Sequence, residues 1–315
     1  IGKINGLKLE LDLKKGALET DIKSLKKAAR KTISPELEKR IQIIIDTSSI
    51  DLKDDFKIYW NNSSIGRITK GKDYLNPSID LLVDDMLSQN QRDKLSNFLE
   101  KWLKNKITTI LKSLFDLKNI RDKNSSIKAL AFQLYENNGV IKRNDVDKIV
   151  KSIPVEERKK LWGMGIKIGR YHIYLPKMLK PKAVEFRISL WKIFNNLSDK
   201  NVIPKSGLNF LINSKFDKNF LLLCGFEKFR DFFVRIDILE KLFLKIIENT
   251  KNRKFKTNAE MMNLLGCSKE NFYKLMSYMD YKKDKAEDTY IFLGEKKEKK
   301  KIIRFDKKEN PFKKL

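Results

Sequence analysis

The stretch Gly165-Ile-Lys-Ile-Gly-Arg-Tyr-His-Ile-Tyr-Leu-Pro-Lys-Met-Leu-Lys-Pro181 has the clearest pattern in this chain. Its apolar and polar residues alternate, which predicts an extended strand over residues 166–175. On this prediction the isoleucines face inward, and the cationic and tyrosine side chains point elsewhere. Cations interleaved with aromatic rings suit a nucleic-acid strand, because cations attract phosphates and ring faces stack on bases.

The predicted nucleic-acid-binding residues come mainly from this stretch. We expect its lysines and its arginine to contact phosphates, and Tyr171 or Tyr174 to stack on bases. His172 is the only histidine, and no carboxylate lies near it in sequence, so we do not expect it to act as a general base. The predicted set in this stretch is Lys167, Arg170, Tyr171, His172, Tyr174, Lys177 and Lys180.

A second motif covers residues 258–279 and has the pattern of a helix-turn-helix. Gly266 suits the left-handed position that ends a first short helix, and Ser268 suits the N-cap of a second. Residues 286–293 could form a strand or wing after it, so a C-terminal winged-helix-like module is expected. The second helix exposes Lys269 and Lys274, which join the predicted binding set, but nearby acidic residues favour structural or non-specific contact over reading of bases.

Composition supports a polyanionic partner. The chain has 315 residues and a net charge of +27, which favours nucleic acid first and an anionic membrane second. An alternative remains open, because 55 of the 68 cations are lysine and A/T-rich coding sequence raises lysine content on any surface. The two cysteines make no disulfide framework, and no apolar run is long enough to span a bilayer. We therefore expect a cytoplasmic protein with no membrane partner.

The periodicity predicts a mainly α protein with small β elements, that is, an α+β class with a helical body. A hairpin is expected around Asn61-Asn62, and Pro35 is expected to begin a second helix with Ser34 as its N-cap. The tryptophans are expected in the core. Trp162 is the one most expected to be exposed, because it precedes the glycines that lead into the basic stretch. The expected organisation is a small α+β segment at 1–87 that could hold a duplicated hairpin-helix unit, a helical body at 88–200 with the basic strand 166–175, a helix-strand-helix and winged-helix-like part at 201–294, and a basic tail at 295–315.

Several motifs of catalysis are missing from the sequence. It contains no Gly-x-x-x-x-Gly-Lys-Ser/Thr phosphate loop, no Gly-x-Gly-x-x-Gly signature and no Gly-x-Ser-x-Gly elbow. One histidine and two isolated cysteines cannot assemble a usual zinc site. We therefore predict no catalytic residue, no metal site and no cofactor for this chain.

The 165–181 stretch resembles the C-terminal region of alphaproteobacterial superfamily II helicases, relatives of the mitochondrial degradosome RNA helicase. The resemblance runs through nearly all of the chain in the same order, although only this stretch is specific by itself. The weaker segments are Ile65-Gly66-Arg67-Ile68, Lys128-Ala129-Leu130-Ala131-Phe132-Gln133-Leu134, Arg235-Ile236-Asp237-Ile238-Leu239-Glu240 and Leu264-Leu265-Gly266-Cys267-Ser268.

The resemblance implies an accessory region that binds or guides single-stranded RNA or DNA beside an ATP-driven motor. No motor residue is present, so ATP and Mg would belong to that missing motor, and the first residue, Ile1, fits a piece of a longer protein. Two alternatives stay open. One is a scaffold that docks a nuclease or the motor, and the other is a winged-helix regulator that binds DNA.

Overall fold

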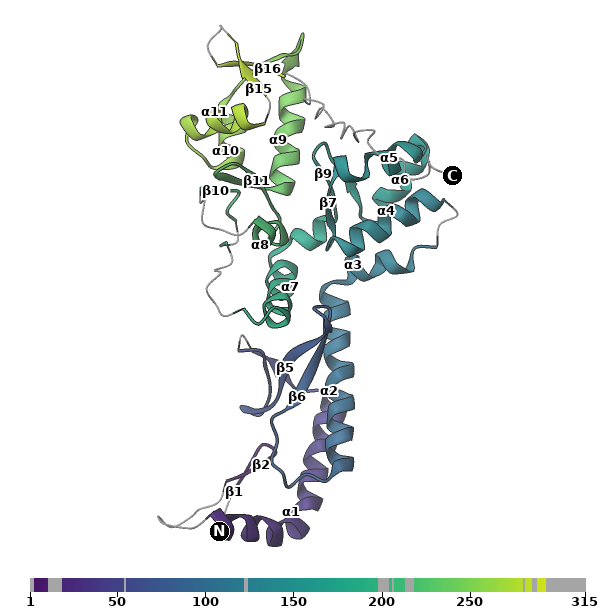
Figure 1. Ribbon diagram of the computed structural model, residues 1–315, viewed down its shortest axis with the longest axis vertical. Helices are drawn as coiled ribbons and strands as arrows, with labels where there is room; N and C mark the ends of the chain where they lie inside the picture. The colour runs from purple at the N-terminus through teal and green to yellow at the C-terminus, as the bar shows by residue number, and fades with distance from the viewer. Residues whose placement is uncertain are drawn as a thin grey trace, which may run out of the picture.

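The computed structural model describes residues 3–10, 19–53, 55–121, 124–197, 204–205, 207–212, 218–279, 281–284 and 288–292. Helices and several small antiparallel sheets are both present, which confirms the predicted α+β class. The predicted basic tail at 295–315 lies outside these residues. Figure 1 shows an elongated molecule in which an N-terminal arm lies below two lobes.

The arm consists of a four-stranded antiparallel sheet and two helices. The predicted hairpin is confirmed, and its turn residues Asn61 and Asn62 adopt φ values of 45° and 62°, which asparagine tolerates better than most residues. The long helix α2, Gln89–Ile110, packs along β6 and buries a stripe of leucines at Leu95, Leu99 and Leu103. The sheet order is β3 (Asp51–Leu52), β4 (Lys57–Trp60), β5 (Ser63–Asp73), β6 (Asn76–Leu81), and a separate hairpin pairs β1 (Lys3–Asn5) with β2 (Lys8–Glu10).

The helix α1, Glu19–Thr47, corrects one prediction, because Pro35 lies inside it and does not begin a second helix. Proline removes one backbone hydrogen bond but does not have to end a helix when packing holds both sides. The Gln91 side chain donates to the backbone oxygen of Ser34 at 3.2 Å, next to the proline, and Leu37 is buried just after it. Packing against α2 therefore keeps the helix continuous across Pro35, where one backbone hydrogen bond is missing.

A first unit occupies residues 125–174. It is preceded by α3 (Lys112–Phe115) and the 3₁₀ turn η1 (Asp116–Asn119). The unit begins after Asn124, which caps its first helix because its side chain accepts hydrogen bonds from the backbone N–H groups of Ser126 and Ile127. Its three strands pair in the order β7–β9–β8. In chain order the unit is α4 (Ser125–Glu136), β7 (Val140–Lys142), η2 (Arg143–Val146), α5 (Asp147–Ser152), α6 (Val155–Gly163), β8 (Lys167–Ile168) and β9 (His172–Tyr174).

A second unit occupies residues 236–292 and has a similar order of elements, with one additional strand, β13, and no counterpart of η2. Gly266 has a φ of 69° between its two short helices, and Ser268 caps the second of them, as predicted. Three of its strands pair in the order β14–β16–β15, which repeats the first–third–second order of the first unit. In chain order the unit is α9 (Ile236–Glu248), β13 (Thr250–Lys251), β14 (Lys254–Lys256), α10 (Ala259–Leu265), α11 (Lys269–Tyr278), β15 (Tyr281–Lys283) and β16 (Thr289–Phe292).

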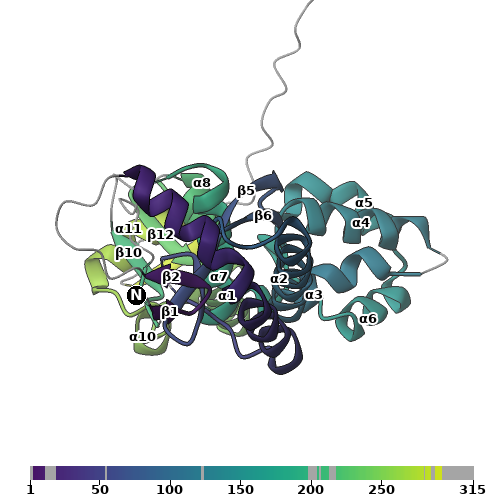
Figure 2. The same ribbon diagram turned by 90° about the horizontal axis from the view of Figure 1, so that it is seen from below.

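The segment between the two units joins them to the arm. It contains η3 (Pro176–Leu179), α7 (Pro181–Phe194), α8 (Lys218–Leu223) and a sheet in the order β10 (Phe210–Ile212), β12 (Phe232–Arg235), β11 (Phe226–Phe229). The helix α7 packs against β5 and α2 of the arm, and Figure 1 shows it between the arm and the lobe that contains α9. Figure 2, seen from below, shows α4, α5 and α6 on one side of α2, and α10 and α11 on the other. The two units therefore lie on opposite sides of the axis of the arm.

The side chains of α9 offer a matched test of the core of the second unit. Leu239 is completely buried, whereas Leu244 on the same helix is 59% exposed. We expect Leu239→Ala to lower the free energy of unfolding by about 2 to 5 kcal/mol because it leaves a cavity. Leu244→Ala should change it by less than about 0.5 kcal/mol. Urea unfolding followed by circular dichroism measures both, and equal effects would contradict the assigned core.

Candidate nucleic-acid interface

The basic stretch lies at the junction of the two units, in part against α9. The predicted continuous strand at 166–175 is wrong, because β8 and β9 form a hairpin that turns at residues 169–171. The Glu240 carboxylate accepts three backbone N–H bonds at this turn, from Arg170 at 2.6 Å, Tyr171 at 2.9 Å and His172 at 2.8 Å. A buried carboxylate with three such donors is well satisfied, so the turn is fixed to α9.

Gly169 makes this contact possible. A Cβ atom at position 169 would lie 2.2 Å from the Glu240 carboxyl carbon, which is closer than two atoms can approach. The Gly169 backbone is held on the other side as well, because its oxygen accepts from Arg143 at 2.8 Å and its N–H donates to the His172 oxygen. The glycine therefore allows the close approach of the turn to α9.

His172 belongs to the predicted binding set, but only 1% of it is exposed, so it is not accessible to a nucleic acid. Its Nε2 lies 2.7 Å from a carboxylate oxygen of Glu227, and its Nδ1 lies 3.7 Å from Glu240. Burial lowers the pKa of His172, but the hydrogen bond with Glu227 and the nearby Glu240 carboxylate outweigh it and raise the pKa above its usual value. The Nδ1 atom has no hydrogen-bond partner among the described residues. Burial raises the pKa of Glu227, and its bonds with His172 and Lys142 outweigh this and lower it.

The two tyrosines also differ from the prediction. Tyr174 is 5% exposed, and the Tyr171 ring packs edge-on against Phe243 of α9 with centroids 5.7 Å apart. Burial is the first cause that raises the pKa of Tyr171, and its hydroxyl also interacts with that of Tyr281 from the second unit. The face of Tyr174 is closed to a base, and most of Tyr171 is covered by the second unit.

The cations of the stretch divide into two groups. Arg170 is half-buried and lies over the Phe243 ring at 5.8 Å, so it belongs to the junction. Lys167, Lys177 and Lys180 are exposed, and no carboxylate among the described residues forms an ion pair with any of them. Lys167 pairs with Tyr174 in the β8–β9 hairpin. Tyr174 is the last residue of β9, and the chain continues from there into the η3 turn, which contains Lys177. These lysines remain available to phosphates.

Trp162, near the end of α6 and five residues before Lys167, is 73% exposed. It lies on the outer face of the helix with Val155 and Lys159, at the spacing i, i+4, i+7 that places side chains on one side. Gly163 and Gly165 follow, and a Cβ at either would meet no atom within 4 Å. We use the name α6 face for Lys159 and Trp162 on α6 together with the exposed Lys167, which follows on β8.

Trp162 agrees with the prediction of one exposed tryptophan, whereas Lys159 is not in the predicted binding set. The sequence does carry a signal for Lys159, because a lysine three residues before an exposed tryptophan shares its helix face. Two acidic residues, Glu156 and Glu157, lie on the same helix, and Glu156 is exposed about one turn before Lys159. Glu157 pairs with Lys160 at 3.9 Å and also accepts a hydrogen bond from Asn124, whereas Lys159 has no ion pair with a described residue.

The predicted cations of the second unit are neutralised. Lys269 pairs with Asp288 at 3.1 Å, and Lys274 pairs with Glu270 at 2.6 Å one turn away on α11. Asp288 also accepts a hydrogen bond from Tyr273. The face of α11 therefore carries little net positive charge, in contrast to the α6 face.

Within the described part of the chain, no cluster of three potential metal ligands occurs, and no helix has the length and apolar character to cross a bilayer. No protein-family model, no curated protein and no solved structure matches this chain.

The junction can be tested through Gly169. In Gly169→Ala the new methyl group must displace the Glu240 carboxylate and break its bonds to the turn, so we expect the free energy of unfolding to fall by about 1 to 3 kcal/mol. The matched control is Gly163→Ala, which has open space and a helical neighbour, and should not destabilise the protein. Similar midpoints of urea unfolding for the two variants would contradict the close approach.

The junction also predicts a pH dependence. Because the folded pKa of His172 is raised from 6.5, its contribution to stability is complete below pH 6.5 and is lost as pH rises through the folded value. Because the pKa of Glu227 is lowered from 4.5, its contribution is complete above pH 4.5 and is lost at lower pH. Urea unfolding from about pH 5.5 to 9 should show stability falling above pH 6.5. His172→Gln should remove that decrease, and an unchanged pH profile in this variant would argue against the assignment.

Proposed function

We propose that this chain is a nucleic-acid-binding accessory region that holds a single strand on the α6 face. The observation that carries the proposal is Trp162, a large aromatic ring that is 73% exposed between lysines with no ion-pair partner among the described residues. Exposed tryptophan is uncommon outside binding sites, and a base stacked on an aromatic ring contributes about 1 to 3 kcal/mol.

We further propose that both units are winged helices. Each has a helix, a strand, two helices and a two-stranded hairpin, with the strands paired in the order first, third, second. In such a unit the last helix, here α6 or α11, is the one that commonly contacts nucleic acid. The first unit keeps the outer face of that helix open, while its hairpin turn is held by Glu240.

The charge distribution supports a division between the units. On the α6 face, Lys159 and Lys167 can contribute their full charge to a phosphate backbone. On α11 the equivalent cations are already paired with Glu270 and Asp288, so an approaching phosphate gains less from them. This pairing weighs against the alternative of a DNA-binding regulator that uses residues 258–279.

The resemblance to superfamily II helicases supports a location beside an ATP-driven motor, which would supply ATP hydrolysis and bind Mg. In that setting the α6 face would hold the strand that the motor moves. The supporting residues are the stretch 165–181, which forms the junction of the two units and carries Lys167, Lys177 and Lys180 on its exposed side. RNA and DNA strands offer the same phosphates and base faces to this surface.

A second candidate function, a protein-docking scaffold, is favoured by a different feature. A pocket of about 350 Å³ is lined by Leu117, Ile120 and the 60% exposed Phe132 on α4, with Lys118 over the Tyr135 ring at 4.2 Å. Exposed apolar surface of this kind is typical of protein interfaces. Phe132→Ala should weaken capture of such a partner and leave binding of oligonucleotides unchanged.

The nucleic-acid proposal is tested with a labelled single-stranded oligonucleotide at two salt concentrations. Trp162→Ala should weaken binding by about 1 to 3 kcal/mol, as expected when one base no longer stacks. The double variant Lys159→Ala/Lys167→Ala should reduce the slope of log K against log salt by about 0.7 for each phosphate that the protein no longer neutralises.

The matched control is Lys269→Ala/Lys274→Ala, which removes the same charge from the second unit. Because these lysines are ion-paired, this variant should bind nearly as well as the natural chain. Circular dichroism confirms that all variants remain folded. An equal decrease in affinity in both double variants would show that binding depends on total charge alone, and an unaffected Trp162→Ala would remove the stacking role.

A further inference from the structure

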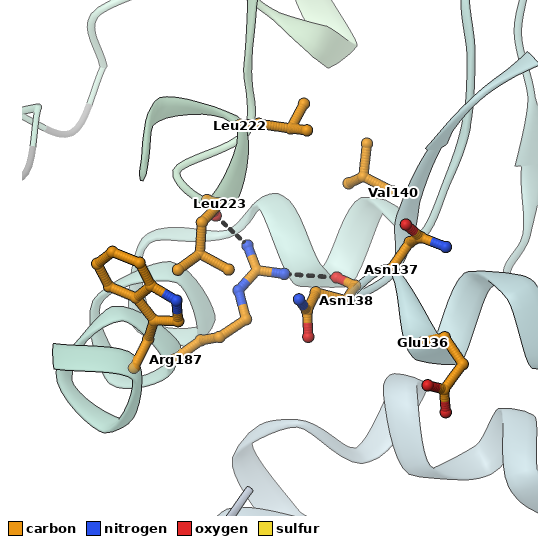
Figure 3. A pocket seen from close by; sticks show the side chains of 8 residues that line it. Glu136, Asn137, Asn138, Val140, Arg187, Leu222 and Leu223 are labelled. Atoms are coloured by element: carbon orange, nitrogen blue, oxygen red, sulfur yellow. Dashed lines mark hydrogen bonds between the residues drawn. The ribbon is translucent and has the colours of Figure 1, made fainter. Parts of the chain in front are cut away.

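Arg187 is a buried cation at the point where three parts of the chain meet. It lies on α7, and its side chain is 1% exposed. One terminal nitrogen, Nη1, donates to the backbone oxygen of Asn138 at 2.6 Å, and Nη2 donates to that of Leu223 at 2.5 Å. Figure 3 shows the guanidinium between these two oxygens, one from the first unit and one from α8 in the segment between the units.

The charge of Arg187 has no acidic partner among the described residues. No described carboxylate forms an ion pair with it, and its Nε has no hydrogen-bond partner in the described part of the chain. Burial lowers the pKa of Arg187 because the charged form is taken out of water. The Tyr74 hydroxyl from the arm is another buried polar group without a hydrogen-bond partner among the described residues. Buried charges in proteins are normally paired, so the site has an excess of positive charge.

A pocket of about 210 Å³ adjoins this guanidinium. This volume is far above the roughly 10 to 15 Å³ that one water molecule needs. The polar residues that line it are Glu136, Asn137 and Asn138, and its apolar walls include Val140 and Leu222. In Figure 3, Val140 and Leu222 lie above the guanidinium and the asparagines lie to its right.

We propose that this pocket binds a phosphoryl group. The side-chain amide of Asn138 can donate to its oxygens, and that of Asn137, which already donates to the Gln133 backbone oxygen at 2.8 Å, keeps one further N–H. The Arg187 charge acts through a poorly hydrated environment where screening is weak. The guanidinium keeps its two carbonyl bonds, since each terminal nitrogen carries a second N–H. A phosphoryl group has more acceptor oxygens than a carboxylate and so satisfies more of these donors.

Glu136 opposes an anion and therefore provides an informative variant. It is exposed at the rim of the pocket, and Figure 3 shows its carboxylate pointing away from the guanidinium. Removing its charge should strengthen phosphate binding if the pocket is an anion site. A purely structural Arg187, which only joins two carbonyls, predicts no effect of Glu136 on any ligand.

The proposed site does not rest on the role of the α6 face, because inorganic phosphate alone tests it. The direct readout is the Arg187 Nε–H resonance and the Asn137 side-chain amide in ¹⁵N spectra, followed during titration with inorganic phosphate. Sodium chloride at equal ionic strength is the control. We expect saturable shifts with phosphate and none with chloride.

Three variants make the test independent of Arg187 itself, whose replacement could unfold the junction. Asn137→Ala should weaken phosphate binding about tenfold, the size expected for a hydrogen bond to a charged group. Leu222→Trp should fill the pocket and abolish the saturable shifts. Glu136→Gln should strengthen binding severalfold.

The source of the phosphoryl group is resolved by two further probes, adenosine monophosphate and oligonucleotides with or without a 5′ phosphate. Tighter binding of the phosphorylated oligonucleotide assigns the pocket to the end of a strand. Binding of inorganic phosphate and the mononucleotide, with no effect of the 5′ phosphate, assigns it to small phosphate compounds. Shifts that match those of chloride, or that persist unchanged in Leu222→Trp, overturn the proposal.

Discussion

The arrangement of the two units depends on one carboxylate, that of Glu240. It accepts three consecutive backbone N–H groups from the turn of the first unit, so a helix of the second unit satisfies donors that would otherwise be buried without partners. Gly169 leaves room for this carboxylate, and His172 lies between it and Glu227. The stretch of cations and aromatics therefore forms a buried contact between the two units, and only its lysines remain at the surface.

Features with local signals could be predicted from the sequence. The N-cap at Ser268 and the left-handed Gly266 depend on residues within one turn, and they occur where predicted. The burial of Tyr174 and His172 could not be predicted, because the acidic neighbours of this hairpin come from positions 55 to 70 residues later in the chain. Alternation indicates two faces of a strand, but it does not say which face a distant helix will cover.

The excess of lysine has different consequences in different places. Lys269 and Lys274 form ion pairs at the surface, where such pairs contribute little to stability. Lys159 and Lys167 have no ion pair with a described residue and flank an exposed tryptophan. The same residue type therefore forms ion pairs on the surface of α11 and, at Lys159 and Lys167, surface cations without such pairs to described residues. Net charge alone does not distinguish these two surfaces, whereas the positions of neighbouring acidic residues do.

The two buried basic side chains at the joints provide the sharpest contrast. His172 has Glu227 and Glu240 beside it, so its charge is balanced within the protein and its role is to hold the units together. Arg187 has only carbonyl oxygens among the described residues, which satisfy N–H donors but do not cancel a full positive charge. Its charge has no carboxylate partner among the described residues, and the pocket beside it has space for an anion. A carboxylate in that position would have closed the site, as Glu240 closes the hairpin turn.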